Sequence, residues 1–230
     1  MTILLYDLVG HDESRPFSPH CWKSAMALAH KALDFRRVPT PFTSVPTVEG
    51  ALSKTVPVIR DGNQVVGDSF EIALYLERAY PQRPSLFAGE GGKSLSRFVE
   101  RWSQLTIHPY LAAVALLDIH ARLAPADQAY FRSSRERRYG RTLEAVVAER
   151  ETGLAAFRSG LEPLRSMLGM QPFIGGQSPL FADYVVFGAF QWVRIMSPFC
   201  VFADDDPVAA WFARCLDLHG GLGRSVAAAA

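Results

Sequence analysis

The stretch Ser18-Pro19-His20-Cys21-Trp22-Lys23 reads as the start of a helix that follows a polar loop. Pro19 suits the first helical turn, because the N–H that proline lacks would have no partner in that turn. Ser18 then stands at the N-cap, where its hydroxyl accepts a hydrogen bond from a free backbone N–H and stabilises the helix by about 1 kcal/mol. A helix N-terminus also favours negative charge, so Ser18 has two interpretations, a helix cap and a stabiliser of a bound thiolate.

Short apolar runs and helical patterns alternate around this stretch up to about residue 82. We expect strands at 3–8, 35–38, 56–59 and 65–66, helices from Pro19 and from Asp68, and a proline-containing loop at 39–50. Asp61-Gly62 is a hairpin turn signal between the last two strands. The resulting order, β-α-β and then β-β-α, is that of a thioredoxin-like sheet.

Residues 81–93 contain two prolines and three glycines, and they mark the expected linker. Beyond it the sequence shows helical patterns and no convincing strand, at about 93–122, 127–140, 142–168, 181–197 and 207–218. Pro109 and Pro163 are expected to kink or break two of these helices. The sequence therefore predicts an α/β thioredoxin-like domain at 1–82 and an all-α helical domain at 93–230.

Composition excludes several other classes of protein. The net charge of +1 on 230 residues gives no field for nucleic acid or an anionic membrane, and no apolar run is long enough to span a bilayer. The basic run 132–141 includes Glu136 and reads as a solvated or interface face. Three cysteines favour a reducing compartment, so we expect a cytoplasmic protein, and six scattered histidines in no ligand spacing predict no metal site.

Cys21 lies three residues after Ser18, the spacing of a CxxC redox pair. Because Ser18 has no thiol, Cys21 has no resolving partner in this motif. The favoured interpretation is a small buried apolar side chain. Monothiol exchange chemistry is the alternative.

Two further motifs, Val56-Pro57 and Asp68-Ser69, flank the expected hairpin. Proline at the start of an edge strand is normally trans, and the sequence alone does not distinguish this from the rarer cis bond. Asp68 with Glu71 fits a capping box at the start of a helix. The free N–H groups there and the Ser69 hydroxyl also make a carboxylate site.

Together these motifs resemble those of glutathione transferases, and most closely the bacterial β-etherase type with related fungal enzymes. The likeness extends over nearly the whole chain, and its helical part includes Thr142-Leu143-Glu144, Phe181-Ala182-Asp183-Tyr184 and Asp205-Asp206-Pro207. One departure is Leu180, which stands where most members carry a small polar helix cap.

The resemblance implies a homodimer that binds glutathione in its first domain. It implies Ser18 beside the sulfur as the catalytic residue. The expected glutathione contacts are Val56, Pro57, Asp68, Ser69 and Lys54. A hydrophobic electrophile would lie between the domains, with Phe17, Trp102, His108, Tyr110, Leu116 and His120 as candidate contacts.

The expected function is attack by the glutathione thiolate on a hydrophobic, aromatic electrophile, with cleavage of β-aryl ethers as one form of the reaction. Two alternatives remain open at this point. One is a non-catalytic protein that binds glutathione or a hydrophobic ligand. The other is a thiol oxidoreductase that depends on Cys21.

Overall fold

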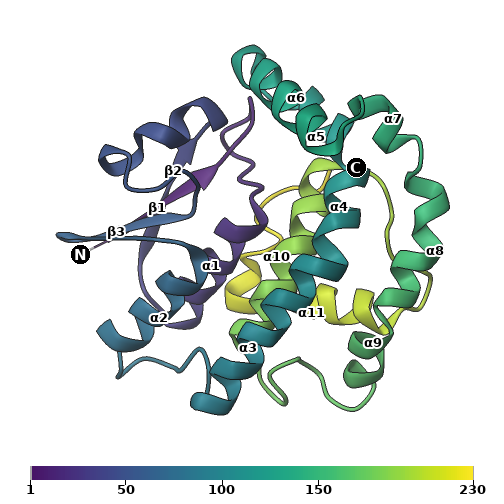
Figure 1. Cartoon of the computed structure of the whole chain (residues 1–230). Helices are drawn as coiled ribbons and strands as arrows, with labels where there is room; N and C mark the ends of the chain where they lie inside the picture. The colour runs from purple at the N-terminus through teal and green to yellow at the C-terminus, as the bar shows by residue number, and fades with distance from the viewer. Residues whose placement is uncertain (1, 230) are drawn as a thin grey trace.

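The computed structural model describes residues 2–229, so Met1 and Ala230 lie outside it. A four-stranded sheet lies at the left of Figure 1 and a helical half at the right, with α1 between them. This is a thioredoxin-like α/β part followed by a helical part, as the sequence predicts.

The α/β part alternates strands and helices in the predicted order. Its elements are β1 (Ile3–Leu8), α1 (Pro19–His30), β2 (Phe35–Thr40), η1 (Phe42–Gly50), β3 (Val58–Asp61), β4 (Gln64–Gly67) and α2 (Ser69–Ala79). The strand order is β2-β1-β3-β4, with β1 parallel to β2 and antiparallel to β3. Alternate residues of β1 are fully buried, which is the period-2 pattern of a strand with one face on a core.

The segment 39–50 differs from the expected loop. β2 continues to Thr40, and η1 is a 3-10 segment interrupted by non-helical backbone at Val48 and Glu49. The Asp127 carboxylate of a distant helix accepts hydrogen bonds from the backbone N–H groups of Phe42 (2.9 Å) and Thr43 (2.8 Å). This tertiary contact satisfies the first turn of η1, and no local sequence signal reveals it.

The helical half contains more and shorter helices than the sequence suggests. They are α3 (Glu90–Trp102), a π-helical turn η2 (Ser103–Ile107), α4 (His108–Val114), α5 (Leu116–Ala121), α6 (Pro125–Tyr139), α7 (Leu143–Val147), α8 (Arg150–Gly160), α9 (Glu162–Leu168), α10 (Phe181–Met196) and α11 (Pro207–Gly221). Pro109 and Pro163 each lie in the first turn of a new helix, α4 and α9. Pro163 follows the turn at Leu161, where its missing N–H costs nothing. Pro109 causes no break, because α3, η2 and α4 follow one another without interruption from Glu90 to Val114, and the π-helical turn η2 before it is the local irregularity.

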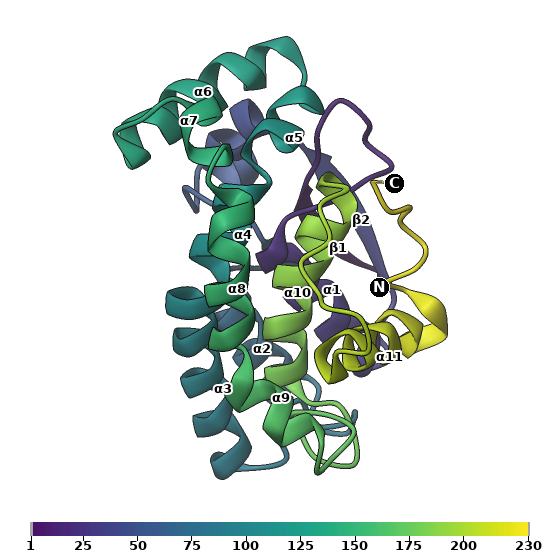
Figure 2. The same ribbon diagram turned by 90° about the vertical axis from the view of Figure 1, so that its right-hand side faces the viewer.

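Helix α10 is the central element of this half, and it runs through the middle of the molecule in Figure 2. It packs against α1, and a Cβ built on Gly188 would lie 2.2 Å from the carbonyl oxygen of Pro19. Only glycine allows the two helices to approach so closely at this point. The position of the α1 N-terminus therefore depends on α10.

Asp183 takes over the capping that Leu180 cannot provide at the start of α10. Its buried carboxylate accepts hydrogen bonds from the backbone N–H groups of Leu180 (2.9 Å), Ile174 (2.7 Å) and Gly175 (2.9 Å). The indole Nε1–H of Trp211 donates a fourth, at 2.9 Å. One buried charge is thus fully hydrogen-bonded and ties α10 to α11 and to the preceding loop.

None of the helices formed by residues 2–229 combines the length and apolarity that crossing a lipid bilayer demands.

Candidate functional site

A cavity of about 760 Å³ opens between the start of α1, η1 and the helices α4 to α6. In Figure 1, α6 lies at the same end of the molecule as η1, which it contacts. The residues that line the cavity are Leu8, Phe17, Ser18, Pro19, His20, Phe42, Val45, Pro46, Lys54, Thr55, Val56, Gln104, His108, Pro109, Ala112, Ile119, Tyr130, Phe131, Arg135, Arg138, Tyr139 and Trp192. The cavity therefore joins the two halves of the chain.

Ser18 lies on the cavity wall at the N-cap of α1 and is 4% exposed. Its hydroxyl oxygen accepts a hydrogen bond from the backbone N–H of Cys21 at 3.3 Å. A hydroxyl has one hydrogen to donate in addition to its acceptor lone pairs. Ser18 can therefore cap the helix and donate to an anion at the same time, so the two interpretations of this residue are compatible.

The peptide bond between Val56 and Pro57 is cis. Val56 and Lys54 line the same cavity as Ser18, and β3 begins two residues after Val56. Within residues 2–229 the Lys54 ammonium forms no ion pair or hydrogen bond, so it is available to an anionic ligand. Val56 therefore lines the cavity on the side of β3.

Asp68 and Ser69 begin α2, outside the group of residues that lines the cavity. Asp68 has a left-handed backbone (φ 68°), and its carboxylate accepts from the N–H groups of Phe70 (2.8 Å) and Glu71 (3.1 Å). The side chain of Glu71 pairs with Arg97 at 3.2 Å. The expected capping box is therefore only half formed. A strained residue of this kind costs about 1–3 kcal/mol and is typical of ligand sites.

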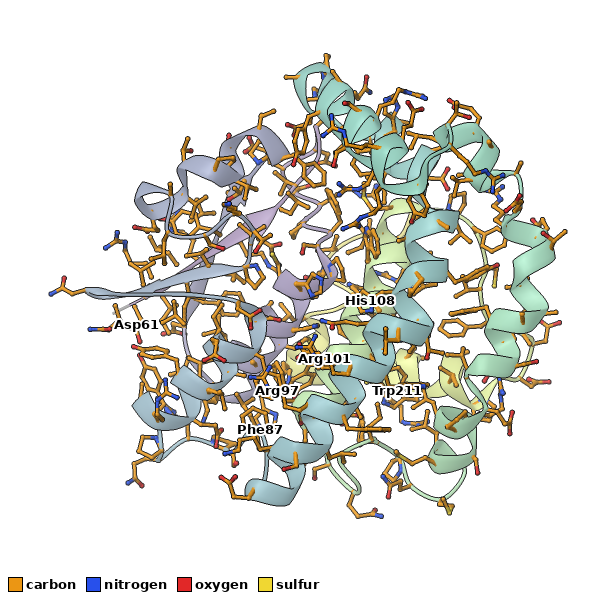
Figure 3. All side chains as sticks on the ribbon, in the orientation of Figure 1. Asp61, Phe87, Arg97, Arg101, His108 and Trp211 are labelled. Atoms are coloured by element: carbon orange, nitrogen blue, oxygen red, sulfur yellow. The ribbon has the colours of Figure 1, made fainter. Side chains whose placement is uncertain are left out.

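Two histidine rings that line the cavity together with Ser18 stack on each other. The rings of His20 and His108 lie 5.5 Å apart at an interplanar angle of 13°. Figure 3 labels His108 near the middle of the molecule, on the side of the helical half that faces α1. Because the Ser103 carbonyl can only accept, the His108 Nδ1 that lies 3.1 Å from it carries the proton.

The other ring nitrogen of His108, Nε2, is buried and has no protein partner within residues 2–229. Burial, and then the charge of Lys23, lowers the pKa of His108 to about 4. Burial lowers the pKa of His20 well below its ordinary value, followed by the Lys23 charge. Both rings are neutral at pH 7, so His108 offers an unused hydrogen-bond acceptor here.

Only two of the six expected electrophile contacts, Phe17 and His108, line the cavity. Tyr110 stacks on Phe157 with ring centroids 4.4 Å apart, and its hydroxyl donates to the Arg150 carbonyl at 2.6 Å. Leu116 is 2% exposed in the core, and the remaining two are half-buried elsewhere, Trp102 at the end of α3 and His120 on α5. None of these four side chains is among those that line the cavity.

The outer wall of the cavity comes from side chains that sequence reasoning did not single out. Tyr130, Phe131, Arg135, Arg138 and Tyr139 all belong to α6. Phe131, Arg135 and Arg138 are spaced i, i+4 and i+7, the period of one helix face. This period was a usable signal, but the basic run 132–141 reads from sequence as a solvated surface.

Cys21 is completely buried and makes a weak 3.8 Å contact from Sγ to the Tyr6 carbonyl. Burial raises the pKa of the Cys21 thiol well above its ordinary value, and the neighbouring charge of Asp7 raises it further. A reactive cysteine needs an accessible thiolate. The environment of Cys21 therefore favours the packing interpretation over thiol exchange. Residues 2–229 also bring together no cluster of three or more histidine, cysteine, aspartate or glutamate side chains suited to a metal ion.

Comparison with known proteins gives matches to both halves of the chain. A family model described as "Glutathione S-transferase, C-terminal domain" matches residues 94–217, and "Glutathione S-transferase, N-terminal domain" matches residues 17–79. Glutathione S-transferase Z1 of Arabidopsis thaliana is 34% identical over 76 residues. That match spans only 34% of the relative's length.

Solved structures resemble the whole chain. A glutathione S-transferase of Ceriporiopsis subvermispora in complex with glutathione superposes with a TM-score of 0.82 at 22% identity, over 93% of this chain and 96% of that one. Glutathione transferase GSTFuA3 of Phanerochaete chrysosporium gives a TM-score of 0.75 at 26% identity, over 98% and 95%. At 22% identity, the likeness to the Ceriporiopsis subvermispora structure is a likeness of fold.

Proposed function

The chain belongs to the glutathione S-transferase family, and we propose that it joins the sulfur of glutathione to a hydrophobic, aromatic electrophile. The single observation that carries this proposal is Ser18, whose hydroxyl lines the cavity at a helix N-terminus with its hydrogen free to donate. A hydroxyl in this position can stabilise a thiolate that lies in the cavity.

Ser18 and the N-terminus of α1 can contribute the free energy that stabilising a glutathione thiolate requires. A free thiol has a pKa near 8.5 and is mostly protonated at neutral pH. Lowering that pKa by about two units requires roughly 2.7 kcal/mol. A charge-assisted hydrogen bond contributes about 1.5–3 kcal/mol and a helix N-terminus adds about 0.3–1 kcal/mol. Ser18 and the end of α1 together supply this amount.

We propose that glutathione itself is held by the residues that the resemblance implies. The backbone of Val56, before the cis Pro57, meets the cysteinyl backbone. The start of α2, with Asp68 and Ser69, receives the γ-glutamyl end, and Lys54 meets the glycyl carboxylate. The free ammonium of Lys54 on the cavity wall and the strained cap at Asp68 support these assignments.

The reaction then proceeds as a displacement. The thiolate sulfur attacks the electrophilic carbon, a C–S bond forms, and the bond to the leaving group breaks with its electron pair. In a β-aryl ether the attacked carbon bears the ether oxygen, and the leaving group is a phenolate. Phe17, Phe42 and Phe131 give the cavity the aromatic lining that such a substrate would contact.

We also propose that the protein is a cytoplasmic homodimer, divided into domains at 1–82 and 93–230. The dimer proposal is supported by Phe98 and Leu95 of α3 and by Leu105 of η2, which are 68%, 37% and 79% exposed. A contiguous exposed apolar patch marks an association surface, and these three side chains are the candidates for one on this side of the chain. Three free cysteines fit a reducing compartment.

Turnover measurements test the proposed function. Purified protein is incubated with glutathione and either a chlorodinitrobenzene or a β-aryl ether that releases a chromogenic phenolate. We expect conjugate formation that Ser18→Ala reduces by about 10- to 100-fold. Saturable glutathione binding without turnover of any electrophile would indicate the non-catalytic binding protein instead. Turnover lost on Cys21→Ala and kept in Ser18→Ala would indicate the oxidoreductase.

A further inference from the structure

The charged side chains that line the cavity are all cationic. They are Lys54 from the strand side and Arg135 and Arg138 from α6, and no aspartate or glutamate of residues 2–229 lines the cavity with them. A concave site with one sign of charge concentrates ligands of the opposite sign. A neutral aromatic substrate alone does not account for this arrangement.

Arg135 is half-buried, and its charge has no carboxylate partner within residues 2–229. Its guanidinium lies over the rings of Phe131 (4.7 Å) and Phe42 (5.7 Å) and donates one hydrogen bond, to Ser134 Oγ at 3.0 Å. By contrast, Arg132 on the same helix pairs with Glu136 and Glu144, both at 2.9 Å. The helix therefore neutralises an arginine outside the cavity and leaves one inside it unpaired.

The surroundings of Arg135 oppose its own charge. Burial lowers the pKa of its guanidinium, and the nearby charge of Arg138 lowers it further. Taking a cation out of water beside a second cation is unfavourable unless an anion compensates it. The aromatic rings stabilise the guanidinium only in part. A bound anion would compensate the charge of the half-buried Arg135, and the exposed Arg138 on the same helix face could pair with it as well.

Other polar groups on the cavity wall are also donors without a partner. The Trp192 indole Nε1 is buried and unpaired within residues 2–229. The hydroxyls of Tyr130 and Tyr139 form no hydrogen bond to those residues either, and both side chains line the cavity. Tyr130 is 51% exposed, so water reaches its hydroxyl, whereas a buried donor such as Trp192 Nε1 is normally paired and points to a ligand that accepts a hydrogen bond.

We propose that the electrophile of this transferase is an aromatic compound that carries a carboxylate, and that Arg135 and Arg138 bind that carboxylate. The inference rests on the proposed function for the reaction and on the charges of the cavity for the recognition. The aromatic ring lies among Phe17, Phe42 and Phe131, and the carboxylate faces α6. A guanidinium binds a carboxylate through two parallel N–H···O bonds, which fixes the ring's orientation relative to the sulfur.

The test compares ligands that share a shape and differ in charge. The binding pair is 3,5-dinitrobenzoate and 3,5-dinitrobenzamide, measured by titration calorimetry with and without glutathione. The reactive pair is 4-chloro-3,5-dinitrobenzoate and its amide. In either reactive compound the thiolate forms the C–S bond, chloride leaves with the C–Cl electron pair, and the thiol proton passes to solvent.

The variants are Arg135→Gln and Arg138→Gln, with Arg137→Gln as the matched control. Arg137 lies on the same helix and is exposed outside the cavity. We expect the wild type to bind the benzoate about tenfold more tightly than the amide, since a hydrogen bond to a charged group is worth that much. Arg135→Gln and Arg138→Gln should remove most of this preference, and Arg137→Gln should keep it.

Equal affinity of the wild type for benzoate and amide would overturn the proposal. It would also be overturned if Arg135→Gln and Arg138→Gln weakened glutathione binding and left the benzoate affinity unchanged, because the arginines would then serve the glycyl carboxylate. A retained binding preference with no turnover of either chloro compound would instead refute the transferase reaction and leave the anion subsite standing.

Discussion

The hydroxyl oxygen of Ser18 accepts its hydrogen bond from the backbone N–H of Cys21, three residues along α1, at 3.3 Å. This direction of donation leaves the hydroxyl hydrogen unused by the protein. Pro19, between them, contributes no N–H that could compete. The same three residues therefore both begin the helix and present a donor to the cavity.

Two substitutions separate the cap from the donor. Ser18→Ala removes both, so we expect the free energy of unfolding to fall by about 1 kcal/mol. Ser18→Gly also removes the hydroxyl, but glycine is a tolerated N-cap that costs only a few tenths of a kcal/mol. Denaturant titration should rank wild type, glycine and alanine in that order of stability, while both variants lose turnover to the same extent. A glycine variant with wild-type turnover would contradict the donor role.

Gly188 offers a test of how α10 positions the site from a distance. Gly188→Ala places a Cβ 2.2 Å from the Pro19 carbonyl oxygen, so α1 must shift. Overpacking of this kind costs about 1–3 kcal/mol. We expect lower stability and, in protein that remains folded, a reduced kcat because Ser18 moves with Pro19.

The control is Gly91→Ala in the first turn of α3, where no atom lies within 4 Å of the added Cβ. Alanine replaces glycine there in open helical space, and we expect stability to rise by roughly 0.5–1 kcal/mol. If both alanine variants changed stability in the same direction, close packing of α10 on α1 would not be the cause.

Stability should fall in mild acid because the His108 ring is held neutral. Its pKa is about 4 in the folded protein, and a histidine in an unfolded chain has a pKa near 6.5. Below pH 6.5 this histidine is protonated in the unfolded chain but stays neutral in the folded protein. Its contribution to the free energy of unfolding is therefore fully present above pH 6.5 and is lost as the pH falls toward 4. Between pH 7.5 and 5 this one group accounts for a loss on the order of 2 kcal/mol.

The measurement is the free energy of unfolding at pH 7.5 and at pH 5 in wild type and His108→Asn. Because asparagine does not titrate, the free energy of unfolding should differ less between pH 7.5 and pH 5 in His108→Asn than in the wild type. If the free energy of unfolding differed between pH 7.5 and pH 5 as much in His108→Asn as in the wild type, His108 would not be held neutral in the folded protein.

Cys21 should be replaceable. Cys21→Ala removes one small buried group, for which we expect a loss of roughly 1 kcal/mol in stability and near-normal turnover. Mass spectrometry after brief treatment with an alkylating reagent should find Cys200, the exposed cysteine, modified ahead of Cys21. Rapid modification of Cys21, or a mixed disulfide with glutathione on it, would argue for thiol exchange.

The sequence predicts the α/β half of the fold well because its signals are local. Ser18 with Pro19 begins a helix, and Asp61-Gly62 marks a hairpin between adjacent strands. Each of these depends on neighbours within a few residues. The sequence left the Val56-Pro57 bond undecided between trans and cis, and the structure shows it as cis.

The cavity wall was harder to predict because it depends on how helices rotate about their axes. Tyr110 and Arg135 both lie on amphipathic helices, but Tyr110 faces α8 while Arg135 faces the cavity. Helical periodicity identifies a buried face without saying which neighbour covers it. The contact of Asp127 with the start of η1, which holds α6 against η1, joins residues more than 80 positions apart.

The most direct test of the account is the pKa of glutathione's thiol when it is bound. Thiolate absorbance near 240 nm, followed across pH, gives this value for wild type and for Ser18→Ala. We expect a bound pKa about two units below that of free glutathione in the wild type, returning toward the free value in Ser18→Ala. Glutathione that binds to the wild type with an unshifted thiol pKa would contradict the claim that Ser18 and the N-terminus of α1 stabilise the thiolate.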